Sequence, residues 1–306
     1  MTELSSRTPI SLSGPLRVPV QMLADQSYDG HKSVHDGESA AKLGLPGAPI
    51  EGPTHFSQFE PLGVALWGDR WFTHGCISAH FQNMVVDGEE VGARLAIDGP
   101  GAVAGRIDAA KADGTPVLTG TLSVGPDHGA SELSQRLAVA AARPPEKLHI
   151  IDQMMVGQRS SGDELVRMGF DDNMGNLYPF TLRDKLACMT EHLGYHSPGA
   201  GTPWGASVIP IEMISVLTNA FAKPVFVVRQ PSVGLFIDLE VKILAGPILV
   251  GRTYRVEREI VALGASKRTE SYWTRSTLFH GDTAVAEVLL HQGVFKESYP
   301  DYPANG

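Results

Sequence analysis

The chain has 306 residues, of which 42% are hydrophobic and 19% are charged, so we expect a globular protein with one large domain or two of ordinary size. Its formal net charge of −9 argues against nucleic acid or an anionic membrane surface as the main partner. Two cysteines are too few for a disulfide framework, and neither a secretory signal nor an apolar run of membrane-spanning length is recognised, so we expect a cytoplasmic protein outside the membrane.

The first half of the chain is predicted to contain one buried helix followed by strands. Residues 1–14 are polar and predict an N-terminal arm, and a loop-rich stretch with a short helix near Glu38–Leu43 follows. From residue 54 to 67 apolar side chains recur every three or four positions, which is the spacing of one helical face. Pro53 suits the first turn of this helix, because its missing N–H costs nothing there. The strands expected after the helix are 71–86, 90–97, 101–110 and 117–124.

The second half repeats this order after an intervening segment. Residues 131–142 are rich in Ala and Leu and predict a helix within a linker. A helix over 184–195 is expected next, and then a Gly/Pro-rich loop and a helix from Pro210 to about Phe221. The strands expected after it are 235–244, 253–263, 270–279 and 284–292. Both long helices begin near Pro-Ile-Glu, at 49–51 and at 210–212, so we expect an internal duplication.

An apolar helix followed by an antiparallel meander predicts an α+β fold in which the sheet wraps around the helix. Two copies in one chain form a double hotdog. The two sheets are expected to join edge to edge, because an exposed hydrophobic edge strand invites aggregation. The expected division is an arm at 1–14, a first hotdog repeat with the candidate site at 15–125, a linker region at 126–183, a degenerate second repeat at 184–296 and a tail at 297–306.

The stretch 29–67 resembles the signature of the MaoC-like (R)-specific enoyl-CoA hydratases. The resemblance rests on these residues: His35, Ala41, Gly44, Pro49, Ile50 and Gly52. In that family an Asp precedes the His by five positions, whereas the nearest Asp here, Asp29, lies one residue earlier. Glu51 stands where the family has a His before its Gly. The resemblance implies a double hotdog that hydrates a 2-enoyl thioester, or dehydrates a 3-hydroxyacyl thioester, carried by coenzyme A or a carrier protein.

In the hydratase interpretation, Asp29, His35 and Gly52 would together catalyse the addition of water. Asp29 and His35 would flank the double bond, one taking a proton from water and the other delivering a proton to Cα. The backbone N–H of Gly52, at the start of the helix, would polarise the thioester carbonyl and stabilise the enolate. In an alternative interpretation the protein is a hotdog thioesterase, in which Glu51 activates water or attacks the thioester. Glu51 is equally compatible with a favourable position against the helix dipole. A third hypothesis is a non-catalytic double hotdog that binds an acyl ligand.

His31 and His55, near the proposed acid and base, are candidate substrate-binding residues. Lys267 and Arg268 form a basic turn that is compatible with coenzyme A phosphates, although an ordinary solvated turn explains them too. His31 and His35 would share a face only if 29–38 were helical, which the glycines there disfavour. We therefore expect no metal site and no cofactor. Association into a homodimer is left open.

Overall fold

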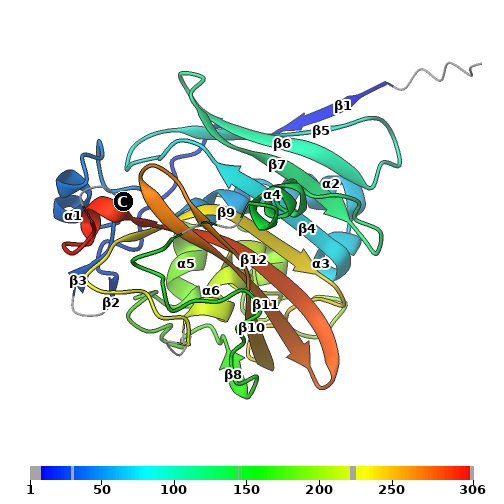
Figure 1. Ribbon diagram of the computed structural model, residues 1–306. Helices are drawn as coiled ribbons and strands as arrows, with labels where there is room; N and C mark the ends of the chain where they lie inside the picture. The colour runs from blue at the N-terminus through cyan, green and yellow to red at the C-terminus, as the bar shows by residue number, and fades with distance from the viewer. Residues whose placement is uncertain (1–7, 29–30, 144, 146, 221–224, 304–306) are drawn as a thin grey trace, which may run out of the picture.

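The computed structural model describes residues 8–28, 31–143, 145, 147–220 and 225–303. Ten strands form one antiparallel sheet in the order β1-β5-β6-β7-β4-β9-β12-β11-β10-β8 (Figure 1). The strands of this sheet are β1 (Ile10–Ser13), β4 (Gly75–Phe81), β5 (Val91–Ile97), β6 (Ala104–Lys111), β7 (Pro116–Val124), β8 (Glu164–Arg167), β9 (Gly234–Ile243), β10 (Thr253–Ala265), β11 (Thr269–His280) and β12 (Thr283–Phe295). A short separate pair is formed by β2 (Ser27–Tyr28) and β3 (His31–Lys32).

The helices are short and are distributed over both halves of the chain. The α-helices are α1 (Gly37–Lys42), α2 (Glu60–Trp67), α3 (Arg70–His74), α4 (Glu132–Ala141), α5 (Leu182–Cys188) and α6 (Ile211–Asn219). The 3₁₀ segments are η1 (Gly52–Gln58), η2 (Gly194–His196) and η3 (Lys296–Ser298). None of the described helices has the length and hydropathy that a bilayer crossing requires.

The two halves of the chain meet where β4 pairs with β9. The pairing is antiparallel and places Cys76 opposite Lys242 and His80 opposite Asp238. In Figure 1 the strands of the first half run across the upper part in cyan and green, and those of the second half descend in yellow to red. The predicted edge-to-edge joining of the two sheets is therefore confirmed, and one continuous sheet serves both halves.

The first central helix is not continuous, contrary to the helix predicted over 54–67. Residues Gly52–Gln58 form the 3₁₀ segment η1, and the α-helix α2 begins only at Glu60. Pro61 explains the break, because proline has no N–H to donate and restricts the backbone of the residue before it. In the second half α6 begins at Ile211, close to the predicted Pro210. It packs against η1, so the beginnings of the two central helices lie together.

Some predicted boundaries were wrong. The strand expected over 71–86 starts only at Gly75, because Arg70–His74 form α3. Trp71 and Phe72, which favour strands locally, are fully buried there, and tertiary packing outweighs their β propensity. The helix expected over 184–195 is α5, which ends at Cys188.

Two segments expected to be an arm and a linker supply the outer strands of the sheet. β1, within the predicted arm, pairs with β5, and Ile10 and Leu12 pack against the core. β8, within the predicted linker region, pairs with β10. Both outer strands have four residues, which limits the exposed edge at each end of the sheet.

Helix α4 covers the junction between the halves and is held there by a buried carboxylate. Asp238 on β9 is fully buried and pairs with His80 of β4 (Nδ1–Oδ1, 2.7 Å) and His291 of β12 (Nδ1–Oδ2, 2.6 Å). Arg136 of α4 lies 2.9 Å from the same carboxylate (Nε–Oδ1). Hydrogen bonds from the two histidines help to lower the pKa of Asp238 to about 2, against the opposing effect of burial. One side chain thus connects both halves of the sheet with the helix that links them.

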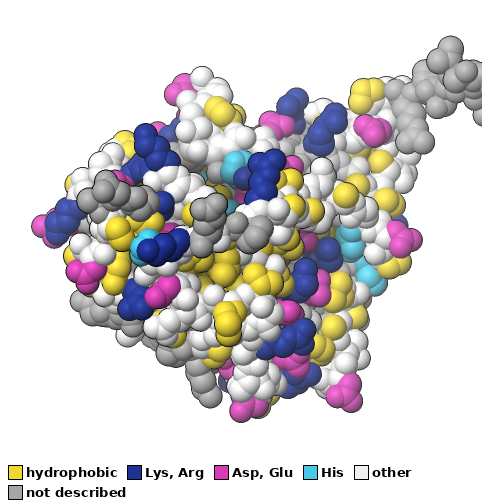
Figure 2. All heavy atoms as spheres, in the orientation of Figure 1, with side chains coloured by type: hydrophobic (Ala, Val, Ile, Leu, Met, Phe, Trp, Pro, Cys, Tyr) yellow, Lys and Arg dark blue, Asp and Glu magenta, His cyan; other side chains and the backbone are white. Residues whose placement is uncertain are grey.

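The face shown in Figure 2 carries Lys and Arg side chains interspersed with Asp and Glu, with hydrophobic side chains visible between them. On this face the basic side chains of the described residues are therefore interrupted by acidic and hydrophobic ones.

We expect Asp238→Asn to lower the free energy of unfolding by about 3 kcal/mol, because it removes the fully buried carboxylate that His80, His291 and Arg136 share. Since folding lowers the pKa of Asp238, its contribution is present above the unfolded pKa of roughly 4 and is lost as the pH falls towards 2. Urea unfolding at pH 7 and across the acid range measures both effects. Asp108→Asn, which removes an exposed pair with Arg94, is the control and should cost less than about 1 kcal/mol. Equal losses from the two variants would contradict the proposed role of Asp238.

Candidate functional site

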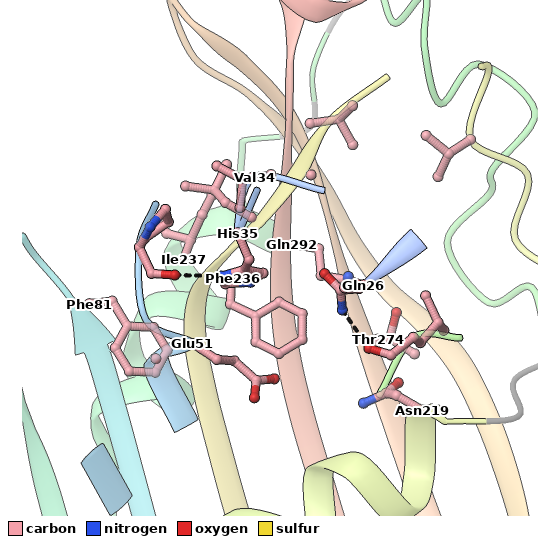
Figure 3. Close-up of a pocket in the computed structure, with 18 of the residues that line it drawn as sticks. Gln26, Val34, His35, Glu51, Phe81, Asn219, Phe236, Ile237, Thr274 and Gln292 are labelled. Carbon is pink, nitrogen blue, oxygen red and sulfur yellow. Dashed lines mark hydrogen bonds between the residues drawn. The ribbon is translucent and has the colours of Figure 1, made fainter. Parts of the chain in front are cut away.

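A cavity of about 860 Å³ lies between the two halves and is lined by residues of both. The first half contributes His35, Glu51, Gly52 and Phe81, and the second contributes Asn219, Phe236, Thr274 and Gln292. Figure 3 shows Glu51 and Phe81 on one side of the cavity, Thr274 and Asn219 on the other, and the Phe236 ring between them. The cavity is large enough for a small organic ligand and combines apolar walls with a few polar groups.

His35 is held in a single tautomer at the cavity wall. It lies in the loop before α1, whose N-terminus is capped by the Asp36 side chain. Its Nδ1 lies 2.6 Å from the carbonyl oxygen of Pro49. Because a carbonyl only accepts, Nδ1 carries the proton and Nε2 carries a lone pair, which has no partner among the described residues. Burial lowers the pKa of His35, so the ring is neutral at pH 7 and can act as a base.

Gly52 begins η1 directly below the ring of Phe81. A Cβ at this position would come within 2.7–2.9 Å of three ring atoms of Phe81, so only glycine fits without a shift of that ring. No described residue accepts a hydrogen bond from the Gly52 N–H. The chain thus provides an unused backbone donor at the cavity wall, next to His35 and Glu51.

Glu51 is a buried carboxyl group whose protonation changes near neutral pH. Burial raises its pKa to about 7, against the attraction of the Lys185 ammonium and a hydrogen bond with Tyr178. The negative charge of Glu212 contributes to the rise. A carboxyl group with a pKa near 7 can serve as an acid or as a base at physiological pH.

Lys185 of α5 lies between the two central helices and is almost completely buried. Its Nζ is 3.4 Å from Oε1 of Glu212 and donates to the Thr54 hydroxyl at 3.1 Å. Burial raises the pKa of Glu212 to about 7, as it does for Glu51. The two Pro-Ile-Glu motifs therefore bring two carboxyl groups towards one lysine, whose charge acts on both.

The other predicted site residues are placed as follows. His55 lines the cavity, and burial lowers its pKa to about 4, so it is neutral. Asp29 lies outside the described residues, and of His31 only the backbone is described. Lys267 and Arg268 lie in the exposed turn between β10 and β11 and do not line the cavity.

In that turn Arg268 pairs with Glu297 and lies over the ring of Phe295, 5.5 Å from its centroid. A role of Lys267 and Arg268 towards coenzyme A phosphates stays a prediction. No group of three or more His, Cys, Asp or Glu within the described ranges is placed to bind a metal ion.

Two residues of this site were missed from the sequence. Lys185 falls with Leu182 and Leu186 on the buried face of α5, and the i, i+3, i+4 spacing of the three residues was a signal that it faces the core. Tyr178 lies in a turn-rich segment without periodicity, where nothing in the pattern indicated that it approaches Glu51.

Comparison with solved structures agrees with the fold. The chain matches a protein of Chloroflexus aurantiacus described as a MaoC domain dehydratase, with 13% identity, 95% coverage of both chains and a TM-score of 0.52. It matches a conserved Mycobacterium tuberculosis protein described as a double hotdog with 14% identity, coverage of 95% and 97%, and a TM-score of 0.52. A further match is a MaoC-like dehydratase, with 12% identity, coverage of 93% and 97%, and a TM-score of 0.51. No family model and no curated protein sequence matches the chain. The predicted double hotdog is confirmed, and the chain has the fold of the MaoC-like dehydratases.

Because Lys185 lies near two carboxyl groups, we expect the effects of Glu51→Gln and Glu212→Gln on stability to be non-additive. At pH 8 Glu51→Gln and Glu212→Gln should each leave stability unchanged or higher, because one carboxylate is enough to balance Lys185. The double variant should lose about 3–5 kcal/mol, because it leaves a buried ammonium without an anion. Urea unfolding of wild type, the two single variants and the double variant measures the coupling. A double variant whose loss of stability equals the sum of the two single effects would refute it.

The same pair makes stability depend on pH. Folding raises both carboxyl pKa values from 4.5 to about 7, so the folded state retains protons that the unfolded chain releases. Stability should therefore fall as the pH rises from about 4.5 to 7, and either single variant should flatten that decline.

Proposed function

We propose that the protein acts on acyl thioesters and that it adds water to a 2-enoyl thioester or removes water from a 3-hydroxyacyl thioester. The observation that carries the proposal is the neutral His35, with its free Nε2 lone pair, in a cavity that it shares with the Gly52 N–H and Glu51. The likeness in fold to MaoC-like dehydratases supports the same reaction class. The substrate in this proposal is an acyl thioester of coenzyme A or of a carrier protein.

In the hydration direction His35 accepts a proton from water at Nε2, and the water oxygen attacks C3 of the enoyl group. The C2–C3 π electrons move onto the thioester oxygen as an enolate, which the Gly52 N–H stabilises. A carboxylic acid then delivers a proton to C2, and the proton on His35 returns to that carboxylate through solvent. The resemblance assigns this acid to Asp29, and Glu51 is the carboxyl group that lines the cavity among the described residues.

A thioesterase is the second candidate, favoured by the position of Glu51 next to Gly52 in the cavity wall. Glu51, when ionised, would activate water or attack the thioester carbonyl, and the Gly52 N–H would bind the oxyanion. The thiol of the carrier would then leave as a free product.

His35→Ala should lower kcat/KM for crotonyl-CoA hydration by about 10² or more, the usual contribution of a general base. The loss of enoyl-thioester absorbance measures the reaction, and circular dichroism checks the fold. His192→Ala is the matched control and should stay within a few-fold of wild type, because His192 does not line the cavity. Activity in His35→Ala equal to that of His192→Ala would exclude His35 as the base.

The carboxyl group is identified by comparing Asp29→Asn with Glu51→Gln. If Asp29 is the acid, Asp29→Asn should reduce hydration steeply, and Glu51→Gln should act only mildly. If the protein is a thioesterase, wild type should release free thiol from saturated acyl-CoA, and Glu51→Gln should abolish that release. Enoyl absorbance and free thiol, followed separately in both variants, decide between the two reactions.

A further inference from the structure

The cavity has a second polar region on the side away from Glu51, to which the second half of the chain contributes Asn219, Thr274 and Gln292. Gln292 of β12 pairs in register with Phe236 of β9 and with Tyr272 of β11, so these three side chains form one row across the sheet. Thr274 lies two residues further along β11, and Asn219 ends α6. Figure 3 shows Gln292, Thr274 and Asn219 around the same part of the cavity.

The hydrogen-bonding capacity of this region is largely unused. Among the described residues, the Gln292 amide and the Thr274 hydroxyl have no hydrogen-bond partner, although Thr274 is only 6% exposed. The Ser232 hydroxyl also lines the cavity, is 2% exposed and has no partner. The Thr274 and Gln292 side chains therefore present free hydrogen-bonding groups to the cavity, and the Ser232 hydroxyl is a buried group without a protein partner, so this region suits a ligand that carries a polar group.

Asn219 determines which kind of partner is needed. Its Nδ2 donates to the carbonyl of Ser215 at 2.8 Å, and a carbonyl can only accept, so the orientation of the amide is assigned by this bond. The remaining Oδ1 has no donor among the described residues. A ligand group here must therefore bring an O–H or N–H, which a ketone or an ether does not have.

The charges nearby exclude an anionic group. Arg258 lines the cavity, but its guanidinium is already bound by both carboxylate oxygens of Glu164 (2.6 and 2.9 Å) and by the Thr218 carbonyl. The C-terminus of α6 adds the negative end of a helix dipole at the same place. A neutral donor fits this region, whereas a carboxylate or phosphate would meet no free cation among the described residues that line it.

We propose that Oδ1 of Asn219 and the side chains of Thr274 and Gln292 bind a hydroxyl group on the acyl chain of the substrate, beyond the carbons that react. The inference rests on the proposed function, since it takes the thioester carbonyl to lie at Gly52. The acyl chain is the source of the hydroxyl rather than the pantetheine arm, because Thr274 and Ser232 are deeply buried and the arm must lead out to solvent. The preferred substrates are therefore hydroxylated acyl thioesters, and plain fatty acyl chains leave this region unsatisfied.

The test measures binding with thioester analogues that cannot be cleaved. Octanoyl-dethia-CoA, in which CH₂ replaces the sulfur, is compared by calorimetry with its 6-, 7- and 8-hydroxy derivatives. At least one hydroxylated analogue should bind wild type ten-fold more tightly or better, because a site built for a hydroxyl discriminates strongly against the analogue without one. Thr274→Val and Gln292→Leu should each remove most of that preference and leave octanoyl binding within about two-fold.

The matched control is Thr277→Val, on the same strand but away from the cavity, which should keep the preference. Equal binding of all four analogues by wild type, or binding of none, would overturn the inference. Equal weakening of octanoyl and hydroxyoctanoyl analogues by Thr274→Val would also overturn it, because it would assign this region to the pantetheine arm. Crotonyl-CoA hydration, which needs no second hydroxyl, is measured in parallel, so that failure of the proposed function is seen separately.

Discussion

The site depends on the antiparallel pairing of β4 with β9, which makes one sheet from two repeated halves. Because the sheet is continuous, the central helices of both halves lie on it, and α6 packs against η1. Each of these helices carries a glutamate near its start, and both glutamates are buried close enough for the charge of Glu212 to raise the pKa of Glu51. The Lys185 ammonium stabilises the ionised form of both glutamates. Burial disfavours that form more strongly, so the pKa of Glu51 and of Glu212 is raised. The charged cluster is thus a consequence of the duplication.

The duplication also explains why the halves have different roles. The first half contributes His35 and Gly52, whose positions follow from a capped short helix and a glycine that fits beneath Phe81. Among the described residues, the second half places no histidine in the cavity, and its strands instead contribute Phe236, Thr274 and Gln292. In the proposed function one half performs the reaction and the other selects the acyl chain.

Much of the fold could be predicted because its signals are local. The apolar periodicity over residues 54–67, the Gly-bearing turns and the repeated Pro-Ile-Glu indicated a helical segment followed by a meander in each half, and the structure has both meanders and a helical segment before each. The errors occurred where local preference and packing disagree. Pro61 interrupts a helix whose apolar spacing is continuous, and Trp71 and Phe72 form a helix despite a sequence typical of a strand.

The candidate site was predictable only in part. His35, Glu51, Gly52 and His55 are close in sequence, so one motif could indicate all of them, and they line one cavity. Tyr178 and Lys185 come from a segment more than 100 residues away, and only the joining of the halves brings them to Glu51. The row of Phe236, Gln292 and Tyr272 depends on strand register, which the residue pattern alone did not determine.

The central claim is that one cavity, built by both halves, holds an acyl thioester with its reacting carbons between His35 and Gly52. A crystal structure of the protein with 3-hydroxybutyryl-dethia-CoA bound tests it most directly. The account predicts the 3-hydroxyl oxygen within about 3.2 Å of His35 Nε2 and the carbonyl oxygen at a similar distance from the Gly52 nitrogen. An acyl group bound in another part of the molecule, or in this cavity with its carbonyl turned away from Gly52, would contradict it.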